Sequence, residues 1–510
     1  MEVELKLLLM PADAAAFRRL AMLAQCAVGK PHLQKFSTTY FDTPALRLKE
    51  RGMELRVRRA GRLWTETLKV GGRAIAGRLP QRQEWKARID GPKPDLATVA
   101  ALVQRGSNWA KVLTAPALAQ GLGPIFDSMF RRTVWSLRLP HGTLVDLALD
   151  QGELRRGHAH EPISEIKLML KAGDPAALFD FALQLQDKVR LRVANLGKAA
   201  RGYALVAPQP STGIKAGAVE LASEMTVDQG FRAVVSNCAA QMQDNESGVV
   251  GSNDSESVHQ MRVGMRRLRS ALGLFAKWAP LPVVLQGELE WLAGELGAAR
   301  DADVLADTTL ARMADACPTD AELPPLKQAA SMIARAKRLR AAASVGSVRY
   351  SRMMLGLVAW LQSSRWRESP DDSARQALAA PLEERAAKIL ARRHQKLLES
   401  GKRLEDGTPE DRHRVRIAAK KARYATEFFQ RLRPAGRVKR YIKRLIALQD
   451  AIGSLNDATV ADGLLRQVEQ SHPELAGSVA FARGFLCCRT HREVRELAEL
   501  WEQCSAMKPP

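Results

Sequence analysis

Short segments in which apolar and polar residues alternate dominate the first part of the chain. They recur at Glu2–Leu9, Glu54–Arg59, Leu63–Val70, Arg82–Ile89, Phe130–Leu139, Thr143–Asp150 and Ile163–Leu170. A period of two residues is typical of strands with one buried face. Helical periodicity interrupts them at about 11–27, 95–105 and 175–190. The pattern predicts a mainly antiparallel β domain over residues 1–206.

The texture of the sequence changes after a proline-rich stretch. Residues 207–218 include Pro208-Gln209-Pro210-Ser211-Thr212-Gly213, which is a composition typical of a linker. From Glu220 to Trp501 the chain is rich in Ala, Leu, Arg and Glu with helical periodicity. We therefore expect an all-α domain over residues 219–505.

The helical part contains an internal repeat. The segment from His259 to Arg269 aligns without a gap with the segment from His413 to Arg423. Farther along, residues 296–302 align with residues 452–458, and both segments contain Gly-x-x-(Arg/Asn)-Asp-Ala. Two motifs in the same order at nearly the same offset predict two similar helical bundles related by a pseudo-two-fold axis.

Charge restricts the class of partner. The net charge is +23, and most of the excess lies before residue 218. This favours nucleic acid, an anionic membrane surface or a phosphate compound. Aromatic residues are only 5% of the chain, which leaves few stacking surfaces and disfavours nucleic acid. No run of 18 apolar residues and no secretory leader occur, so we expect a cytoplasmic protein without a membrane partner.

The six cysteines add no further chemistry. They show no Cys-x-x-Cys spacing. In a cytoplasmic chain of this length they are expected to be reduced residues that contribute to packing, rather than zinc ligands or disulfides.

Several predicted strands oppose a charged face to an apolar face, because alternate residues of a strand share one side. The charged sets are Glu2, Glu4 and Lys6; Glu54, Arg56 and Arg58; Thr65, Thr67 and Lys69; Arg82, Glu84 and Lys86; and Asp146 with Asp150. One such strand usually belongs to a sheet with a solvated side. Recurrence in five strands favours a closed barrel of about eight strands, whose polar interior encloses one small ligand. Mixed carboxylates and cations suit a polyanion that carries a divalent metal.

The ordered motifs of this domain resemble the CYTH superfamily, the triphosphate tunnel metalloenzymes. The first motif is Glu2-x-Glu4-x-Lys6. It is followed by Tyr40-Phe41-Asp42-Thr43-Pro44, Leu55-Arg56-Val57-Arg58, Thr67-Leu68-Lys69, residues 148–153 and residues 198–203. A single Glu-x-Glu-x-Lys is a weak signal, but the series covers nearly all of residues 1–205.

The resemblance implies an inorganic triphosphatase with Mg²⁺ or Mn²⁺ as cofactor. It implies catalytic roles for Glu2, Glu4 and Lys6. The implied metal ligands are Glu2 and Glu4 together with Asp146, Asp150 and Glu165. The implied triphosphate contacts are Lys6, Arg56, Arg58, Lys69, Arg82, Arg132, Lys198 and Arg201. The metal would position the polyphosphate, and a carboxylate would orient or deprotonate the attacking water.

One position departs from the family pattern. A late strand of family members offers a second glutamate two residues after the first, whereas here Lys167 follows Glu165. A lysine in place of a carboxylate changes the local charge by two units, which weakens cation binding and favours direct phosphate contact. The alternative function is therefore a polyphosphate-binding protein with weak or no catalysis. Thiamine-triphosphate hydrolysis and adenylate cyclisation are further alternatives, although no nucleoside pocket is evident.

The helical repeat carries two basic stripes. Residues spaced i, i+3, i+7 and i+10 lie close to one side of a helix. The stripes are His259, Arg262, Arg266 and Arg269, and His413, Arg416, Lys420 and Arg423. One such stripe is ordinarily a solvated face, but recurrence in both repeats favours a basic groove between them. Arg300 and Asp301 are expected to be ion-pair or capping residues.

This second part resembles the CHAD domain, the conserved histidine α-helical domain, over about residues 219–505. The resemblance implies that the two stripes bind inorganic polyphosphate, and it implies no catalysis. We therefore expect an α+β multidomain protein: an eight-stranded antiparallel triphosphate tunnel over 1–206, a linker over 207–218, and two pseudo-symmetric helical bundles over 219–505. The expected partners are inorganic triphosphate and inorganic polyphosphate, and association with polyphosphate granules is the expected location within the cytoplasm.

Overall fold

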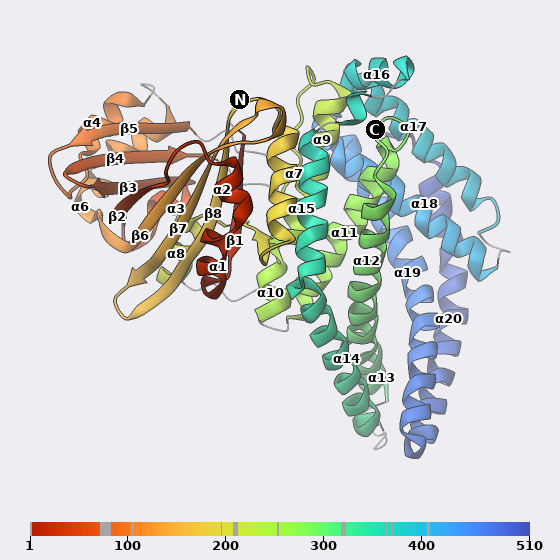
Figure 1. The fold of residues 1–510 in the computed structure, drawn as a ribbon. Helices are drawn as coiled ribbons and strands as arrows, with labels where there is room; N and C mark the ends of the chain where they lie inside the picture. The colour runs from red at the N-terminus through yellow and green to blue at the C-terminus, as the bar shows by residue number, and fades with distance from the viewer. Residues whose placement is uncertain are drawn as a thin grey trace. The chain divides into compact units, whose positions relative to one another are not determined.

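The chain divides into two compact units. The computed structural model describes residues 3–71, 83–103, 107–194, 196–207, 213–251, 254–317, 323–363, 365–368, 371–404 and 408–510. The first unit comprises Met1–Pro210 with Ser351–Ser363, and the second comprises Ser211–Tyr350 with Ser364–Pro510. The first is built on an antiparallel sheet and the second is helical (Figure 1). None of the described helices is long and apolar enough to cross a membrane.

The sheet of the first unit contains nine strands in the described part. They are β1 (Glu4–Leu9), β2 (His32–Asp42), β3 (Met53–Ala60), β4 (Leu63–Val70), β5 (Gln83–Ile89), β6 (Gly123–Arg138), β7 (Leu144–Arg156), β8 (Ala159–Ala172) and β9 (Leu191–Val193). Their order is β5-β4-β3-β2-β6-β7-β8-β1-β9, and every paired neighbour is antiparallel.

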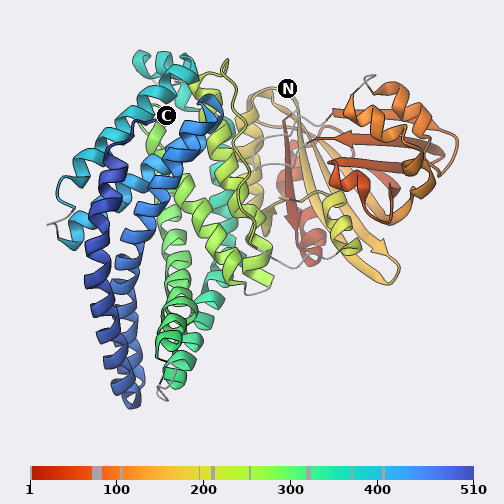
Figure 2. The ribbon, with the colours of Figure 1, turned by 180° about the vertical axis from the view of Figure 1, so that it is seen from behind.

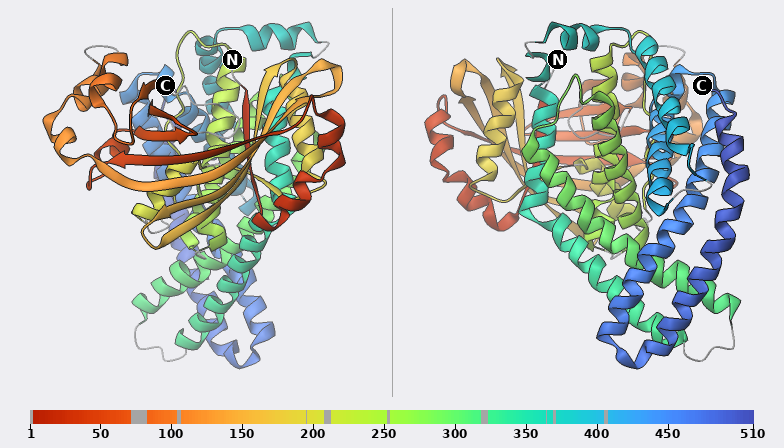
Figure 3. Two further views of the ribbon diagram at one scale, coloured as in Figure 1. Left: turned by 60° about the vertical axis from the view of Figure 1, so that its left-hand side comes forward. Right: turned by 90° about the vertical axis from the view of Figure 1, so that its right-hand side faces the viewer.

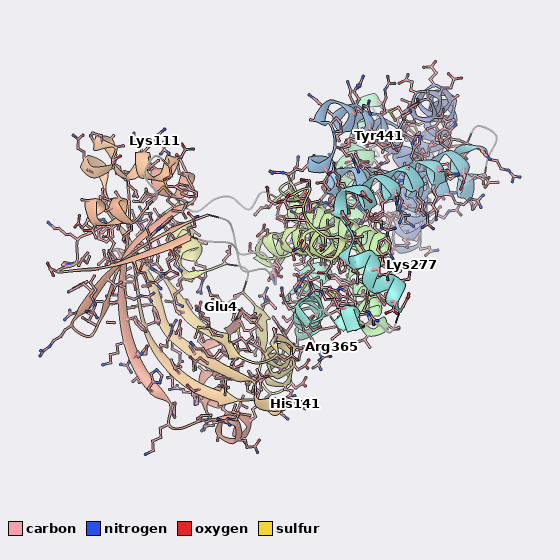
Figure 4. The ribbon with its side chains drawn as sticks, turned by 90° about the horizontal axis from the view of Figure 1, so that it is seen from above. Glu4, Lys111, His141, Lys277, Arg365 and Tyr441 are labelled. Carbon is pink, nitrogen blue, oxygen red and sulfur yellow. The ribbon has the colours of Figure 1, made fainter. Side chains whose placement is uncertain are left out.

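The strand count corrects one expectation, because nine strands occur where eight were expected. The alternation pattern missed β2 and β9. Within the described ranges no ladder joins β5 to β9, so closure of the sheet into a barrel stays a prediction. The strands are strongly curved (Figure 3), and Glu4 lies on the inner side of the curve (Figure 4).

Short helices cover the apolar face of the sheet. The first-unit helices are α1 (Ala14–Arg18), α2 (Ala21–Cys26), α3 (Arg47–Glu50), α4 (Leu96–Leu102), α5 (Asn108–Leu113), α6 (Pro116–Gly121), α7 (Pro175–Gln186) and α8 (Lys198–Val206). Leu55 and Leu68 of the sheet pack with Val99 and Leu118 of these helices in one buried cluster. The alternation along the strands therefore places one face in a hydrophobic core and leaves the other to polar residues.

Helix α8 lies instead against the polar side of the sheet. It contacts β6, β7 and β8. Gly202 allows this approach, because a Cβ at that position would lie 2.0 Å from a ring carbon of Phe126. The next residue, Tyr203, donates a hydrogen bond of 3.1 Å to buried Asp42. Residues 198–203, the last of the motifs noted in the sequence, therefore form the part of α8 that packs against the sheet.

In its described part the second unit is helical apart from turns, 3₁₀ segments and the irregular stretch at residues 213–226. Its α-helices are α9 (Val227–Asp244), α10 (Glu246–Gly251), α11 (Ser255–Phe275), α12 (Val283–Asp303), α13 (Leu310–Ala316), α14 (Leu323–Gly346), α16 (Asp372–Ala379), α17 (Leu382–Gly401), α18 (Pro409–Phe428), α19 (Ala435–Ser471) and α20 (Ala476–Ser505). A π-helical stretch, Val304–Thr309, separates α12 from α13. Helix α15 (Val348–Ser363) belongs mostly to the first unit.

The same order of packing occurs in both halves of the helical unit. Helix α11 packs on α9 and α12, and α12 packs on α14; in the second half α18 packs on α17 and α19, and α19 packs on α20. The long pair α19 and α20 is seen side by side in Figure 2. Helices α11 and α18, which carry the two basic stripes, also contact each other. This recurrence agrees with the repeat in the sequence, and an exact two-fold relation stays a prediction.

Candidate functional site

Strand register gathers the polar side chains of the first unit on one face of the sheet. Lys6 lies opposite Lys167, and Asp150 lies opposite both Glu165 and Arg132. Following the register through β2 to β4 gives the members of this polar face: Glu4, Lys6, Arg56, Arg58, Lys69, Arg132, Asp146, Asp150, Glu165 and Lys167. Lys198 and Arg201 reach the same face from α8. Glu2 and Arg82, two further predicted site residues, lie outside the described residues.

Asp150 is the most buried acid of the polar face, with 1% of its surface exposed. The guanidinium of Arg132 holds both its oxygens, with Nε 2.7 Å from Oδ1 and Nη2 2.8 Å from Oδ2. Lys198 Nζ lies 2.6 Å from Oδ2. Burial alone raises the pKa of Asp150, but the bonds from Arg132 and the charge of Lys198 outweigh it, so the pKa lies below its ordinary value.

Glu165 is held by the cations of helix α8. Its carboxylate pairs with Lys198, and its Oε2 lies 3.5 Å from Arg201 Nη1. Arg201 also pairs with Glu161 at 2.6 Å. Two of the three acids predicted on β7 and β8 as metal ligands, Asp150 and Glu165, therefore already share Lys198.

Glu4 and Lys167 form an ion pair across β1 and β8. Lys167 Nζ lies 2.7 Å from Glu4 Oε2, and Lys6 Nζ lies 3.3 Å from Glu4 Oε1. Burial works against the charge on Glu4, yet Lys6 and Lys167 lower its pKa below the ordinary value. The lysine that departs from the family pattern thus contacts the first-strand glutamate directly.

A second group of charges lies on β3, β4 and β5. Arg56 is within 3.4 Å of Glu54 and 3.7 Å of Glu84, and Lys69 is 3.4 Å from Glu84. Burial together with the neighbouring Arg56 lowers the pKa of Lys69 to about 8. A lysine that loses part of its charge this way gains most from the arrival of an anion.

Two aromatic rings support the cations between these groups. Arg58 and Arg132 lie over Phe36 at 5.0 and 5.4 Å from the ring centroid, and Lys198 lies 4.6 Å from the centroid of Phe130. Sequence reasoning missed Phe36 because it missed β2, whose first residues are exposed on both sides, and it gave Phe130, the first residue of a predicted strand, no role. The alternation of Gln34, Phe36, Thr38 and Tyr40 was the available signal.

The described carboxylates do not fit a resident divalent cation. Within the described ranges, no group of three His, Cys, Asp or Glu side chains is placed to hold a metal ion. Glu4 is paired with Lys167, and Asp146 accepts from Ser136 at 3.0 Å and pairs with Lys171 at 3.2 Å. Magnesium or manganese dependence therefore stays a prediction.

The helical unit brings cations of the two stripes together where α11 meets α18. Arg262 lies 3.4 Å from Asp301, and Arg416 lies 3.8 Å from Asp457. Gly297 and Gly453 lie beside these arginines, since an added Cβ would be in ordinary van der Waals contact, 3.9 Å from Arg262 and 3.7 Å from Arg416. In each half, the repeated Gly-x-x-(Arg/Asn)-Asp-Ala motif thus supplies a glycine that lies beside one arginine and an aspartate that pairs with the same arginine.

Cations at this junction outnumber the acids. Burial, with Arg416, Arg266 and Arg262 nearby, lowers the pKa of Lys420 to about 7. Burial and Arg300 likewise lower the pKa of His259 to about 4. The buried Nε atoms of Arg266 and Arg416 have no hydrogen-bond partner in the described part. We name Arg262, Arg266, Arg416 and Lys420 the central cluster.

Three predicted residues lie away from this cluster. Arg269 and His413 are exposed. Arg423 is engaged by Glu427 and by Gln449 at 2.9 Å. The structure therefore divides the eight predicted polyphosphate residues into a compact centre and a periphery, a division that their helical spacing alone did not indicate.

Known proteins resemble the two parts separately. A sequence family described as the CYTH domain matches residues 1–203, and one described as the CHAD domain matches residues 233–466. Over 208 residues the chain is 31% identical to a protein named inorganic triphosphatase from Haemophilus influenzae. The match covers 41% of this chain and 56% of that protein, so the chain spans about half the length of this curated relative.

Solved structures give the same division. The crystal structure of the CHAD domain from the plant Ricinus communis is 36% identical with a TM-score of 0.53, and the match covers 59% of this chain and 98% of that one. A putative adenylyl cyclase from Hippeastrum, described as having a dominant triphosphatase activity, is 17% identical with a TM-score of 0.29 over 40% of this chain and 96% of that one. The second likeness is too weak to support an argument. Together with the sequence families, the first shows that this chain is a CYTH–CHAD domain protein, with the CYTH domain preceding the CHAD domain.

Proposed function

We propose that the first domain hydrolyses inorganic triphosphate and that the second domain binds inorganic polyphosphate. The observation that carries the first proposal is the polar face itself, where Arg56 and Arg58 of β3, Lys69 of β4 and Arg132 of β6 share one side of the sheet. The name of the Haemophilus influenzae relative supports the choice of triphosphate.

The substrate would replace internal ion pairs. Arg132 now holds Asp150, and Arg56 and Lys69 hold Glu84. Phosphate oxygens are strong acceptors for guanidinium and ammonium groups, so triphosphate would take over these cations from the carboxylates. The half-buried Arg58 and Arg132, both lying over the Phe36 ring, would fix the position of the bound triphosphate.

Chemistry on the bound substrate falls to Glu4 in this proposal. Glu4 is the described acid on β1 and faces the centre of the curve (Figure 4). Its lowered pKa keeps it ionised near neutrality, which suits a carboxylate that orients the attacking water. Mg²⁺ is commonly held by substrate phosphates together with one or two carboxylates. We propose that magnesium or manganese enters as part of the metal–triphosphate substrate.

A second candidate function follows from the pair of Glu4 and Lys167, whose charged atoms are 2.7 Å apart. A glutamate neutralised by lysine is a poor partner for a cation. If the pair persists when substrate binds, the first domain holds triphosphate without hydrolysing it. Binding with no phosphate release distinguishes this candidate from the enzyme.

The central cluster carries the proposal for the second domain. Its four cations come from two helices, α11 and α18. The three arginines of the cluster lower the pKa of Lys420. A polyanion laid over α11 and α18 relieves this repulsion at every cation it contacts. Acids are present, but each is paired with one arginine, so a net positive charge remains.

The experiment uses matched variants of the full chain. Arg132→Ala is expected to lower phosphate release from tripolyphosphate by at least about tenfold, since one charge-assisted contact is worth that much. Arg131→Ala is the control, because Arg131 is exposed on the same strand and on the opposite face. Equal activity of the two variants would contradict a catalytic polar face.

The polyphosphate proposal has its own variants. Arg262→Ala with Arg416→Ala is expected to weaken long-chain polyphosphate binding while triphosphate hydrolysis stays unchanged. Lys327→Ala with Lys388→Ala removes two exposed cations from α14 and α17 and serves as the control. Unchanged polyphosphate affinity in the first double variant would place the polymer elsewhere.

A further inference from the structure

A cavity of about 410 Å³ lies beside the central cluster, between α9, α11, α18 and the segment 213–219. We name it the end pocket. Cationic side chains in its lining are Lys215, Arg266, Arg267 and Arg423. The remaining polar lining comes from His259, Glu427 and the amides of Gln241, Gln260 and Gln430. The end pocket therefore offers donors from several directions around one open-sided hollow.

One wall of the end pocket is a strap of extended chain, residues 213–219. The side chain of Asn245 fixes the strap with two hydrogen bonds. It donates one of 2.9 Å to the carbonyl of Ile214 and accepts one of 2.8 Å from the Ile214 amide. Asn237 donates 3.1 Å to the Gly217 carbonyl. Gly213 lies so close to α11 that an added Cβ would be 2.5 Å from the Glu256 carbonyl oxygen. The strap is thus a built wall, although sequence composition assigned residues 213–218 to a linker.

Two of the four cations in the lining have their charge or donors already engaged. Arg423 pairs with Glu427, and Arg267 donates 2.8 Å to Gln241 and 2.9 Å to Asn237. Arg266 differs, since its buried Nε has no partner in the described part. Lys215 projects from the fixed strap and is exposed. Arg266 and Lys215 are therefore the cations left for a ligand.

The corresponding place in the other half of the repeat is not covered. Arg267 aligns with Lys421 in the sequence repeat, and Lys421 is exposed. The charges that lower its pKa, after burial, are Arg393, Lys396 and Arg269, all positive. One side of the central cluster thus ends in a walled pocket, and the other continues into an open basic surface.

We propose that the end pocket binds the terminal phosphate of a polyphosphate chain, whose next phosphates cross the central cluster toward Lys421. This rests on the proposed polyphosphate function and adds a direction to it. A terminal phosphate has one bridging bond and takes a second negative charge near neutral pH. An internal phosphate has two bridging bonds, so its chain must continue on both sides, and in this proposal the strap stands where the second neighbour would continue.

The test compares two long-chain polyphosphates of equal length, one with free ends and one with both ends blocked as phosphoramidates. Affinity for the full chain is measured by calorimetry in wild type, in Lys215→Glu and in the control Lys327→Glu. Wild type and the control are expected to bind the free-ended polymer about tenfold more tightly than the blocked one, the worth of one charged contact. Lys215→Glu is expected to lose the preference for free ends and to bind both polymers equally.

The outcomes separate the pocket from the function on which it rests. Equal binding of both polymers by wild type overturns end recognition and leaves polyphosphate binding in place. A preference for free ends that survives in Lys215→Glu places end recognition elsewhere, in the first domain for instance, and also overturns the proposal. Absence of binding to either polymer overturns both.

Discussion

Lys167 Nζ lies 2.7 Å from Glu4 Oε2, which places an ammonium group on the carboxylate of the first strand. The contact is sheltered, with 21% of the lysine side chain and 13% of the glutamate side chain exposed. Lys167, which stands where family members have a second glutamate, therefore neutralises Glu4. This ion pair must open if Glu4 is to contact a metal-bearing substrate.

Replacing this lysine by glutamate should strengthen the metal response. Lys167→Glu removes the ion pair and places a second carboxylate beside Glu4, so the local charge changes by two units. We expect the Mg²⁺ or Mn²⁺ concentration for half-maximal phosphate release to fall about tenfold. Metal titration at saturating tripolyphosphate measures this, with exposed Lys35→Glu as the charge-matched control on β2. A similar shift in both variants would mean that net charge alone is responsible.

Loss of Arg132 should also destabilise the first domain. Asp150 is almost fully buried and would keep only Lys198 as a charged partner. Removing one member of a buried ion pair costs about 3 kcal/mol. Urea unfolding of Arg132→Ala against Arg131→Ala measures the difference. An unfolding free energy equal to that of the control would show that the pair contributes little.

The ion pair of Asp150 with Arg132 should also make the stability of the first domain depend on pH in the acidic range. The folded-state pKa of Asp150 is below the ordinary 3.8, so its stabilising contribution is present above that value and is lost as the pH falls through the folded pKa. Asp150→Asn should therefore show a shallower loss of stability below about pH 4. Thermal unfolding across acidic pH provides the comparison, and identical slopes in wild type and variant would exclude Asp150 as the source.

Polyphosphate binding should take up protons. Lys420 has a pKa of about 7 in the ligand-free domain because burial and the arginines around it disfavour its charge. A polyanion offsets the arginines and raises that pKa, so affinity should increase as pH falls from about 8 to about 6. Asp457, the acid that also acts on Lys420, is paired with Arg416. Calorimetry in buffers of different ionisation enthalpy detects the proton, and Lys420→Arg should flatten the pH dependence.

Docking of α8 should depend on one glycine. In Gly202→Ala the new Cβ would meet Phe126 at 2.0 Å, and overpacking of this kind costs about 1–3 kcal/mol. The displaced helix would withdraw Lys198 and Arg201 from Glu165. Gly197→Ala is the control, since nothing lies within 4 Å of its added Cβ. Equal melting temperatures of the two variants would argue against a tight α8 contact.

The sequence predicted faces better than it predicted contacts. Alternation assigned Glu4, Arg56 and Asp150 to a polar face, because a period of two depends only on local backbone geometry. It missed β2, where both sides of the first residues are exposed and the alternation loses its meaning. Alternation also could not predict the pairing of Lys198 with Asp150, because that contact depends on where α8 packs against the sheet.

In the helical domain the repeat revealed the stripes but not their division. Helical spacing placed Arg262 and Arg269 in the same stripe of α11 and gave no reason to separate them. Only the meeting of α11 with α18 makes Arg262 part of the central cluster and leaves Arg269 exposed. The strap was missed because it follows directly on the proline-rich stretch that predicted a linker, while the hydrogen bonds that fix Ile214 come from Asn245, 31 residues along the chain.

The most direct test of the account is phosphate release from tripolyphosphate by the full chain, with Mg²⁺ or Mn²⁺ and after chelation, in wild type and in Glu4→Ala. The account predicts release by the wild type that requires the divalent cation and is lost in Glu4→Ala. Wild-type chain that binds tripolyphosphate but releases no phosphate with either cation would contradict it and leave the binding function.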